Sequence, residues 1–347
     1  MLTYVARTDA DRSSCPAYRP FLAEVRRIVQ LSPSFRRVTF SGPDFDRFGT
    51  AGLDQRVKIV LPFAGAAGTG ASGASASGAP GIEGRYGDCG WFDDDTLEAG
   101  TWYQAWRELP EEQRNPFRTY TVRAIRAATA EAPAELDVDF VVHAGADGHT
   151  AEGPASVWLE TAAVGEEIVI VGPDDLSLDY RVGLDWHPGE AIDYLLAGDE
   201  TAAPAIASIL ESLPAGTRAQ AFLEVPHAGD RLPIAVPEGA DVTITWLARD
   251  DDGDPTLLEA VRTWTETNRD RLTPALAAQA QELADIDVDV EMLWDSPDDA
   301  TGRFYAWLAG ESAVIKLLRR LLVSEIGVDR HRVAFMGYWR LGKAEGQ

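Results

Sequence analysis

The periodicity of the chain changes near Pro188, and this change predicts two domains of different architecture. Before it, short runs of alternating apolar and polar residues recur with turn signals between them, which is typical of a β-barrel or a sandwich. After it, apolar strands alternate with helical segments, which predicts βαβ units and a mostly parallel sheet. A chain of 347 residues is long enough for two such domains with separate cores.

The predicted elements give each domain its bounds. The strands before the change are residues 23–29, 35–40, 56–61, 117–125, 135–143 and 167–171. After it come strands at 191–197, 219–225, 242–247, 303–309 and 333–338, with helices at 202–213, 255–284 (with a possible break near Pro274) and 311–326. We therefore expect an antiparallel β-barrel over residues 18–188. A Rossmann-like parallel-sheet domain with a C-terminal extension follows over residues 189–347.

One segment of the first domain departs from the strand pattern. Residues 64–80 are almost wholly Gly, Ala and Ser, and acidic, turn-rich sequence continues to about residue 100. This composition predicts a flexible insertion over residues 64–100 that carries no chemistry.

Composition excludes several partners. With 31 basic and 56 acidic residues the formal net charge is −25, which disfavours binding to nucleic acid and to anionic membranes. The sequence contains no apolar run of about 20 residues and no signal-peptide pattern at Met1, so we expect a cytoplasmic protein. Cys15 and Cys89 lie in unlike surroundings, which indicates neither a disulfide framework nor a metal site.

The run of residues 115–123 is the first candidate binding element. On a strand Arg118 and Tyr120 share one face, and Thr121 and Arg123 share the other. Guanidinium groups that can grip a pyrophosphate and a ring that can stack suit a flat anionic cofactor such as a flavin dinucleotide. An ordinary half-exposed strand shows the same alternation, so the run alone leaves both interpretations open.

Two further elements could receive a nucleotide. Gly153 and Pro154 start a helix whose first N–H groups, with the Ser156 hydroxyl, could bind a phosphate; an ordinary helix start is the alternative. His143, at the end of the preceding strand, is either structural or a flavin contact. Residues 196–206 join the first strand of the α/β domain to its first helix, where a parallel sheet commonly binds nucleotides, although the three-glycine fingerprint is absent.

The order of these motifs resembles the siderophore-interacting protein family of the ferredoxin reductase-like superfamily. The resemblance is carried by Arg-x-Tyr-Thr-x-Arg at 118–123, Asp-Phe-Val-Val-His at 139–143, Gly-Pro-Ala-Ser-x-Trp at 153–158, Ala-Gly-Asp-Glu-Thr-Ala-x-Pro-Ala-Ile at 197–206, and residues 307–312 and 337–345. It implies a flavin-binding β-barrel followed by a nicotinamide-binding α/β domain. The insertion at 64–100 and the stretch 250–299 are longer than the family's usual loops.

The resemblance also implies roles for individual residues. Its implied cofactor-binding residues are Arg118, Thr119, Tyr120, Thr121, Arg123, His143, Ala155, Ser156, Asp199, Thr201, Ala202 and Trp339. Tyr338 and Trp339 would cover the isoalloxazine, and C-terminal packing is the alternative for this pair. Asp199 and Glu200 would repel a pyrophosphate, so we expect them to point away from it or toward ribose hydroxyls. Basic candidates for an anionic ferric siderophore are Arg249, Arg303, Arg340 and Lys343. Arg249 could alternatively meet a 2′-phosphate. We expect no catalytic side chain and no metal ligand.

The function implied is an FAD-dependent reductase that passes electrons from NADPH or NADH through the flavin to ferric iron in a siderophore. Two alternatives remain: a non-enzymatic siderophore-binding protein, and a reductase of a ferredoxin- or flavodoxin-like partner. The sequence does not distinguish among electron donors, a reduced ferredoxin included, and it does not identify the siderophore.

Overall fold

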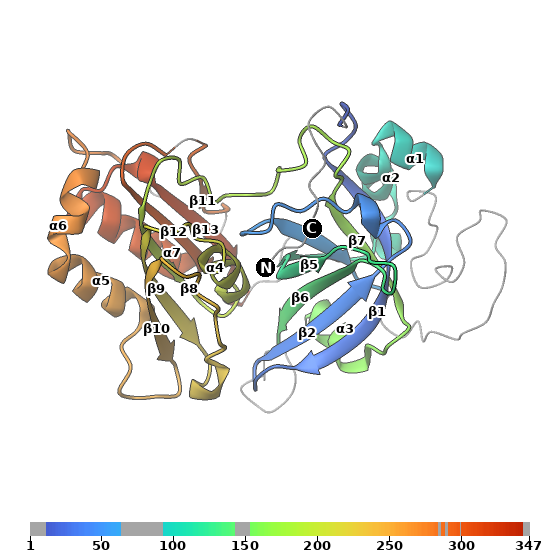
Figure 1. The fold of residues 1–347 in the computed structure, drawn as a ribbon, viewed down its shortest axis with the longest axis horizontal. Coiled ribbons are helices and arrows are strands. Elements are labelled where there is room, and N and C mark those ends of the chain that lie inside the picture. Colours follow the sequence, from blue (N-terminus) through green and yellow to red (C-terminus); the bar gives the residue numbers. More distant parts are fainter. Residues whose placement is uncertain are drawn as a thin grey trace. The chain divides into compact units, whose positions relative to one another are not determined.

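The computed structural model describes residues 12–63, 93–142, 153–283, 286–288, 291–298 and 300–342 (Figure 1). Two predicted site residues, His143 and Lys343, lie outside this described part, as do residues 64–92 of the insertion. Two compact units are present: residues 2–30 with 35–183, and residues 31–34 with 184–346.

The first unit contains a seven-stranded antiparallel sheet. In chain order the strands are β1 (Tyr18–Gln30), β2 (Phe35–Ser41), β3 (Arg56–Val60), β4 (Phe117–Thr121), β5 (Ala124–Arg126), β6 (Glu135–Val141) and β7 (Glu167–Pro173). Five of the six predicted strands are confirmed, and the one predicted over residues 117–125 is instead two strands, β4 and β5. Their order across the sheet is β4-β3-β7-β1-β2-β6-β5. Every pair is antiparallel.

One run of chain joins the two edges of this sheet. β4 and β5 are the outermost strands, yet only Val122 and Arg123 separate them. The Val122 N–H donates to the Gln55 carbonyl at 3.0 Å, and the Arg123 N–H donates to the Asp137 carbonyl at 2.9 Å. Residues 117–126, here called the barrel seam, therefore pair with β3 on one side and β6 on the other and give the sheet its barrel form.

An aromatic chain runs through the core of this unit. The ring of Phe140 on β6 lies 4.4 Å from Tyr120 on β4 and 5.5 Å from Trp158, measured between ring centroids. Trp158 belongs to α3 (Pro154–Thr161) and is buried with Leu159. Because burial of large rings stabilises strongly and specifies geometry, these contacts fix α3 relative to the barrel seam.

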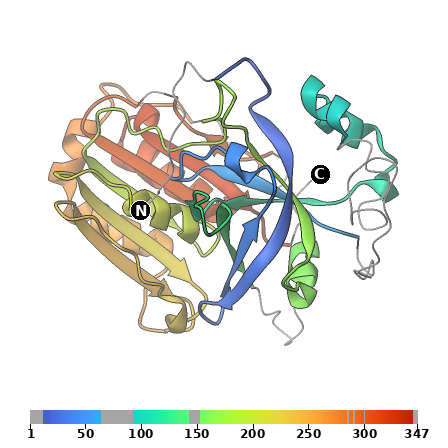
Figure 2. The same ribbon diagram turned by 45° about the vertical axis from the view of Figure 1, so that its right-hand side comes forward.

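The described end of the insertion, residues 93–100, contains a helix that the sequence analysis did not predict. Asp93 caps α1 (Asp94–Ala99) by accepting from the Thr96 N–H at 3.1 Å, and Gly100 ends it with a φ of 67°. Helix α2 (Trp102–Glu108) follows, and the ring of Trp106 packs on that of Phe117 with 4.4 Å between the ring centroids. Figures 1 and 2 show α1 and α2 at the opposite end of the unit from α3. Short 3-10 turns lie at Phe45–Arg47 and Glu111–Gln113.

The second unit contains a six-stranded, mostly parallel sheet, as predicted. Its strands are β8 (Asp193–Gly198), β9 (Arg218–Val225), β10 (Asp241–Ala248), β11 (Trp294–Asp295), β12 (Phe304–Glu311) and β13 (Val333–Trp339). The order is β10-β9-β8-β12-β13-β11, and only the short edge strand β11 is antiparallel.

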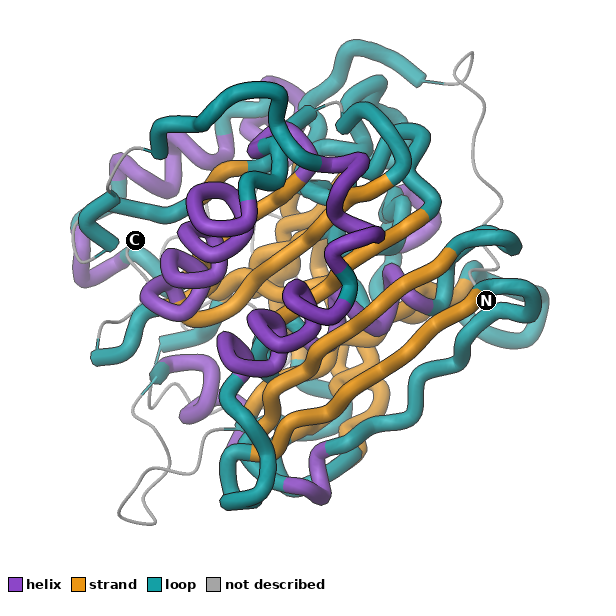
Figure 3. Tube along the Cα trace, turned by 90° about the vertical axis from the view of Figure 1, so that its left-hand side faces the viewer, coloured by secondary structure: helices purple, strands orange, loops and turns teal. Residues whose placement is uncertain are grey.

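Helices cover both faces of the parallel sheet, as Figures 1 and 3 show. They are α4 (Ala203–Leu210), α5 (Leu257–Thr267), α6 (Arg269–Leu272) and α7 (Ser312–Arg319), which continues as a π-helix over Arg320–Ile326. Helices α5, α6 and α7 lie on one face and α4 lies on the other. Short 3-10 turns lie at Ala228–Asp230, Thr273–Ala275 and Arg330–Arg332. In the described part of the chain no helix is long and apolar enough to cross a membrane.

The helix predicted over residues 255–284, with its break near Pro274, does stop at that proline, but residues 276–283 are not helical. Helical structure ends at Ala275, directly after Pro274, which lacks the N–H needed to continue a helix. Leu276 instead forms a β-bridge with Val328, and the Ala277 N–H donates to the Gly327 carbonyl at 2.9 Å. The backbone beyond Pro274 is therefore paired with the chain that follows the π-helix.

Candidate functional site

The barrel seam carries five of the predicted cofactor-binding residues: Arg118, Thr119, Tyr120, Thr121 and Arg123. The Arg118 guanidinium donates to the Phe117 carbonyl at 2.6 Å, and the Thr119 hydroxyl accepts from Lys58 Nζ at 3.1 Å. Thr121 is buried, whereas Tyr120 is half-buried against Phe140. The strand therefore presents guanidinium, hydroxyl and ring groups from the four consecutive positions 118–121 on a backbone held by β3.

Two buried carboxylates lie beneath the arginines of the seam. Asp139 accepts two hydrogen bonds from Arg37, at 2.6 and 2.8 Å, and lies 3.8 Å from Nε of Arg123. Asp137 accepts from Arg126 at 2.7 and 2.8 Å. Burial alone would raise the pKa of Asp137, but its hydrogen bonds, led by those from Arg126, bring it below the usual value. Asp137 therefore orients Arg126, and Asp139 lies close enough to Arg123 to attract its guanidinium.

Sequence analysis did not single out Asp137 and Asp139. The signal was present, because the two aspartates alternate with apolar residues within strand 135–143. Such alternation places both carboxylates on the face away from the apolar core. Three nearby arginines on other strands identify them as partners only when the sheet register is known.

The start of α3 is the second predicted anion-binding element. Among the described residues no side chain caps its first turn, and a Cβ at Gly153 would meet nothing within 4 Å. Ala155 and Ser156 are half-buried in this turn. A helix start that leaves its N–H groups without a capping side chain is suited to an anion.

The carboxyl edge of the parallel sheet brings together three predicted residues around one carboxylate. Asp199, just after β8, accepts from the Thr201 N–H at 2.9 Å, the Thr201 hydroxyl at 2.5 Å and Trp339 Nε1 at 2.7 Å. It also accepts from the Glu311 N–H at 2.8 Å, so it links the turn after β8 to the last residues of β12 and β13. Ala202 is fully buried beside Gly198.

Asp199 is a buried carboxylic acid whose pKa is raised above its ordinary value. Burial, with the nearby Glu200 carboxylate, raises its pKa to about 6, while the hydrogen bonds from Thr201 and Trp339 act in the opposite direction. Of the two orientations expected for Asp199, away from the pyrophosphate or toward ribose hydroxyls, its contacts favour the first, since its oxygens accept from groups within the unit. Its observed role is to hold the turn that precedes α4.

Arg249, predicted to meet a siderophore or a 2′-phosphate, is engaged by two carboxylates. Its guanidinium lies 2.6 Å from Oε1 of Glu200 and 3.2 Å from Oε1 of Glu224. The other oxygen of Glu200 is buried and has no hydrogen-bond partner among the residues that the structure describes. The positive charge of Arg249 is thus offset before any ligand arrives.

The remaining predicted residues of the second unit lie at different edges of the parallel sheet. Arg340 follows β13 at the carboxyl edge, is half-buried, and forms no ion pair within the described ranges. Arg303 precedes β12 and therefore lies at the amino edge, away from Arg249 and Arg340. Tyr338 stacks on Trp294 at 5.7 Å and meets the edge of Trp307 at 6.2 Å.

A metal site was not predicted. Within the described residues no group of three or more His, Cys, Asp or Glu side chains could hold a metal ion.

An antiparallel barrel-like sheet followed by a mostly parallel α/β sheet is the arrangement of the ferredoxin reductase fold. The structure aligns with ferredoxin-NADP+ reductase from Plasmodium falciparum with a TM-score of 0.50 at 9% identity, over 91% of this chain and 95% of that one. At this identity the likeness concerns the fold alone.

The chain belongs to the siderophore-interacting protein family. The family's FAD-binding domain matches residues 24–76 and 95–176, and the siderophore-interacting protein domain matches residues 191–342. The ferric vibriobactin reductase ViuB of Vibrio cholerae is 30% identical over 237 residues, 68% of each chain. The siderophore-interacting protein SipS from Aeromonas hydrophila is 26% identical, with a TM-score of 0.58 over 95% of this chain and 94% of that one.

Proposed function

We propose that this protein is a flavin-dependent ferric-siderophore reductase that draws electrons from a reduced nicotinamide in the cytoplasm. Membership of the siderophore-interacting family, with its FAD-binding domain, supports a flavin and a siderophore. A ferric vibriobactin reductase among its relatives supports reduction of the carried iron. The observation that carries the proposal is the barrel seam, which presents two arginines, two threonines and a tyrosine in one unit with the uncapped start of α3.

The residues of the first unit fit an FAD molecule. Guanidinium groups of Arg118 and Arg123 suit a pyrophosphate, and the first turn of α3 with Ser156 offers N–H and O–H donors to the same group. The Tyr120 ring offers a stacking surface that Phe140 holds in place. Thr119 and Thr121 add hydroxyls at the rim. When bound, FAD supplies conversion between two-electron hydride donors and one-electron acceptors.

The residues of the second unit are assigned the nicotinamide donor. Gly198 and Ala202 leave the turn after β8 compact, since a Cβ at Gly198 would lie 2.5 Å from that of Ala202. Asp199 holds this turn through Thr201, and Trp339 lies against the same carboxylate. In our proposal these residues position the donor and exclude water, and no side chain forms a covalent intermediate.

Arg340 is the described residue best placed to attract an anionic iron carrier. It is half-buried at the carboxyl edge and has no ion-pair partner in the described part of the chain. In a chain of net charge −25, a single basic group that is not neutralised has a large local influence on an anion. Lys343, the other predicted contributor, lies outside the described residues.

The two rival functions predict different outcomes. A non-enzymatic siderophore carrier would bind the siderophore without flavin. A reductase of an acidic ferredoxin- or flavodoxin-like partner needs a basic docking surface, which the charge of −25 disfavours.

Absorbance between about 350 and 500 nm tests the flavin directly. We expect the purified chain to bind FAD, to bleach with a reduced nicotinamide without oxygen, and to regain its colour on addition of a ferric siderophore while a ferrous chelator traps iron. A protein that takes up no FAD would overturn the proposal in favour of a carrier. A reduced protein that a ferredoxin reoxidises, and a ferric siderophore does not, would favour the second rival.

Arg118→Gln tests the assignment of the barrel seam. Loss of a charge-assisted hydrogen bond to the pyrophosphate should weaken FAD binding about tenfold or more, measured by flavin retention in dialysis. The matched control is Arg107→Gln, which removes an exposed guanidinium from α2 in the same unit. Equal retention by the two variants would remove Arg118 from the site without affecting the case for a flavin.

A further inference from the structure

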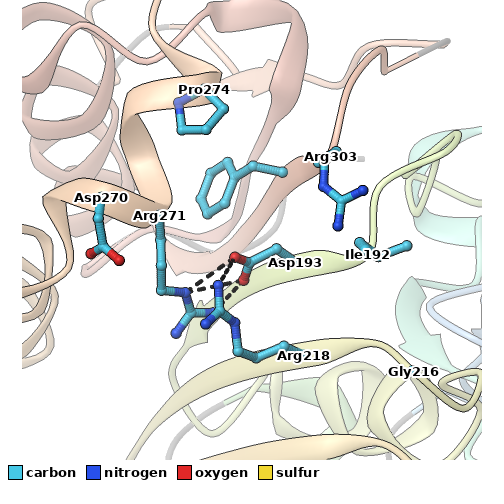
Figure 4. Close-up of a pocket in the computed structure, with 9 residues that line it drawn as sticks. Ile192, Asp193, Gly216, Arg218, Asp270, Arg271, Pro274 and Arg303 are labelled. Atoms are coloured by element: carbon cyan, nitrogen blue, oxygen red, sulfur yellow. Dashed lines mark hydrogen bonds and ion pairs between the residues drawn. The ribbon is translucent and has the colours of Figure 1, made fainter.

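A cavity of about 310 Å³ opens at the amino edge of the parallel sheet (Figure 4). It lies at the opposite end of the strands from the turn after β8 that is assigned the nicotinamide donor. Its charged lining comprises Arg218, Arg271, Arg303, Asp193 and Asp270. None of these belongs to the proposed flavin or nicotinamide contacts.

Strand register brings this lining together. Asp193, Arg218 and Phe304 are the first residues of β8, β9 and β12, and Asp193 is the partner of both others in the parallel ladders. Arg271 comes from α6, on the layer that covers the sheet. The cavity is therefore built on strand ends and a helix, which hold side chains more precisely than loops do.

Asp193 fixes two of the three arginines. Its Oδ2 lies 2.5 Å from Nη2 of Arg218, and Arg271 donates to its carboxylate through both Nε and Nη2. The Arg271 guanidinium also lies over the Trp264 ring, 4.9 Å from the centroid. In Figure 4 these two side chains converge on Asp193. A structural clamp would account for this pair, because one carboxylate holds α6 to the sheet edge.

Arg303 is not accounted for by the clamp. It is exposed, extends from the start of β12, and makes no hydrogen bond or ion pair through its side chain with any described residue. Three guanidinium groups against two carboxylates leave this cavity with one net positive charge, in a chain whose net charge is −25. Outside the lining, the Asp241 carboxylate at the start of β10 also acts electrostatically on Arg218.

We propose that this cavity binds a small oxyanion carrying two or more negative charges, either a polycarboxylate or a phosphate. Planar guanidinium forks match carboxylate and phosphate oxygens, and two of them are already oriented by Asp193. Arg303 supplies the unpaired fork, and Phe304, Pro274 and Ile192 supply the apolar wall. The cavity volume of about 310 Å³ accommodates a phosphate or a small polycarboxylate. It is at the lower limit of the volumes of pockets that bind drug-sized molecules.

The proposal does not depend on the proposed redox function. The anion would bind to the second unit whether or not the first unit holds flavin. Its effect would be measured as stabilisation of the folded state by mass action.

Titration of the full chain, saturated with FAD, tests the site. Inorganic phosphate and citrate are added separately at constant ionic strength, with chloride as the monovalent reference, and binding is followed by calorimetry and by the thermal midpoint. We expect saturable binding of at least one polyvalent anion and none of chloride. Tighter binding of phosphate would identify the ligand as a phosphate, and tighter binding of citrate would identify it as a polycarboxylate.

Arg303→Gln should weaken that binding about tenfold, the loss of one charge-assisted hydrogen bond. Because Arg303 is exposed and has no partner within the described residues, folding is expected to be unaffected. The control is Arg269→Gln, which removes an exposed arginine of α6 that does not line the cavity. Equal weakening by both variants, full binding by Arg303→Gln, or no saturable binding in the parent would each overturn the proposal.

Discussion

Strand β8 carries an aspartate at each end, and the two carboxylates are stabilised in different ways. Asp193, at the amino edge, is matched by the guanidinium groups of Arg218 and Arg271. Asp199, just past the carboxyl edge, is held by neutral N–H and O–H donors and lies near Glu200. One edge of the sheet therefore offers positive charge, and the other offers a buried acid whose ionisation is unfavourable. The ligands suited to each edge differ accordingly.

The largest expected effect is from Asp193→Asn. Removing this carboxylate leaves Arg218 and the well-buried Arg271 close together without a counter-charge, which should lower the free energy of unfolding by about 3 kcal/mol. Urea unfolding at neutral pH measures it. Asp270→Asn, an exposed carboxylate of the same cavity, should change the value by less than about 0.5 kcal/mol. Similar costs for the two variants would show that Asp193 does not act as a clamp.

The second expected effect is a pH dependence of the free energy of unfolding that comes from the ionisation of Asp199. Its folded pKa of about 6 exceeds the ordinary 3.8, so the folded state binds its proton more tightly than the unfolded state. This stabilisation is fully present below pH 3.8 and is lost as the pH rises through about 6; its size is at most roughly 3 kcal/mol. Asp199→Asn should remove that part of the profile of unfolding free energy against pH.

Asp329 gives the control of opposite sign. Burial would raise its pKa, but hydrogen bonds from His331 lower it below 3.8, so its contribution is present above that pH and is lost on acidification. Asp329→Asn should therefore remove stability at neutral pH that falls away in acid. A profile that Asp199→Asn leaves unchanged would contradict the raised pKa.

The third effect concerns the electron donor and depends on the proposed function. Because Glu200 and Glu224 already engage Arg249, a 2′-phosphate would meet a neutralised guanidinium flanked by carboxylates. We expect kcat/KM with NADH to exceed that with NADPH by about tenfold. Glu224→Gln should narrow the ratio, while Glu238→Gln, at an exposed position, should not. A parent enzyme that prefers NADPH would contradict this use of Arg249.

The smallest effect compares two tryptophans that each donate to a buried aspartate. Trp339 Nε1 binds Asp199 at 2.7 Å, and Trp294 Nε1 binds Asp185 at 3.0 Å. Each Trp→Phe substitution should cost about 1 kcal/mol through the lost hydrogen bond. The Trp339 hydrogen bond lowers the pKa of Asp199. Only Trp339→Phe should therefore move upward the pH range over which the stabilisation from Asp199 is lost. An equal shift in both variants would show that the window does not report Asp199.

Much of the fold could be predicted because it depends on local periodicity. Alternation with a period of two gave the barrel strands, and buried apolar runs gave the parallel ones. The helix predicted to reach residue 284 failed because the pairing of Leu276 with Val328 is a long-range contact. Helix α1 was missed because its short acidic segment has little apolar periodicity and is fixed by its Asp93 cap.

The sequence predicted the residue types of the candidate site better than it predicted which residues contact one another. The motif at 118–123 led to the barrel seam, but nothing local shows that Asp139 lies beside Arg123. Arg303 and Arg249 were grouped as basic residues, although one precedes a parallel strand and the other follows one. Because the carboxyl ends of parallel strands share an edge, strand direction separates them once both strands are assigned.

The barrel seam links the proposed cofactor contacts to the local opening of the fold. Its ten residues both join the sheet edges and carry the groups assigned to the flavin, so separation of β4 from β3 would also dismantle the binding surface. A ligand held there must slow that separation. Amide hydrogen exchange at Val122 and Arg123 should therefore become slower in proportion to cofactor occupancy, which makes these two amides a local gauge of flavin binding.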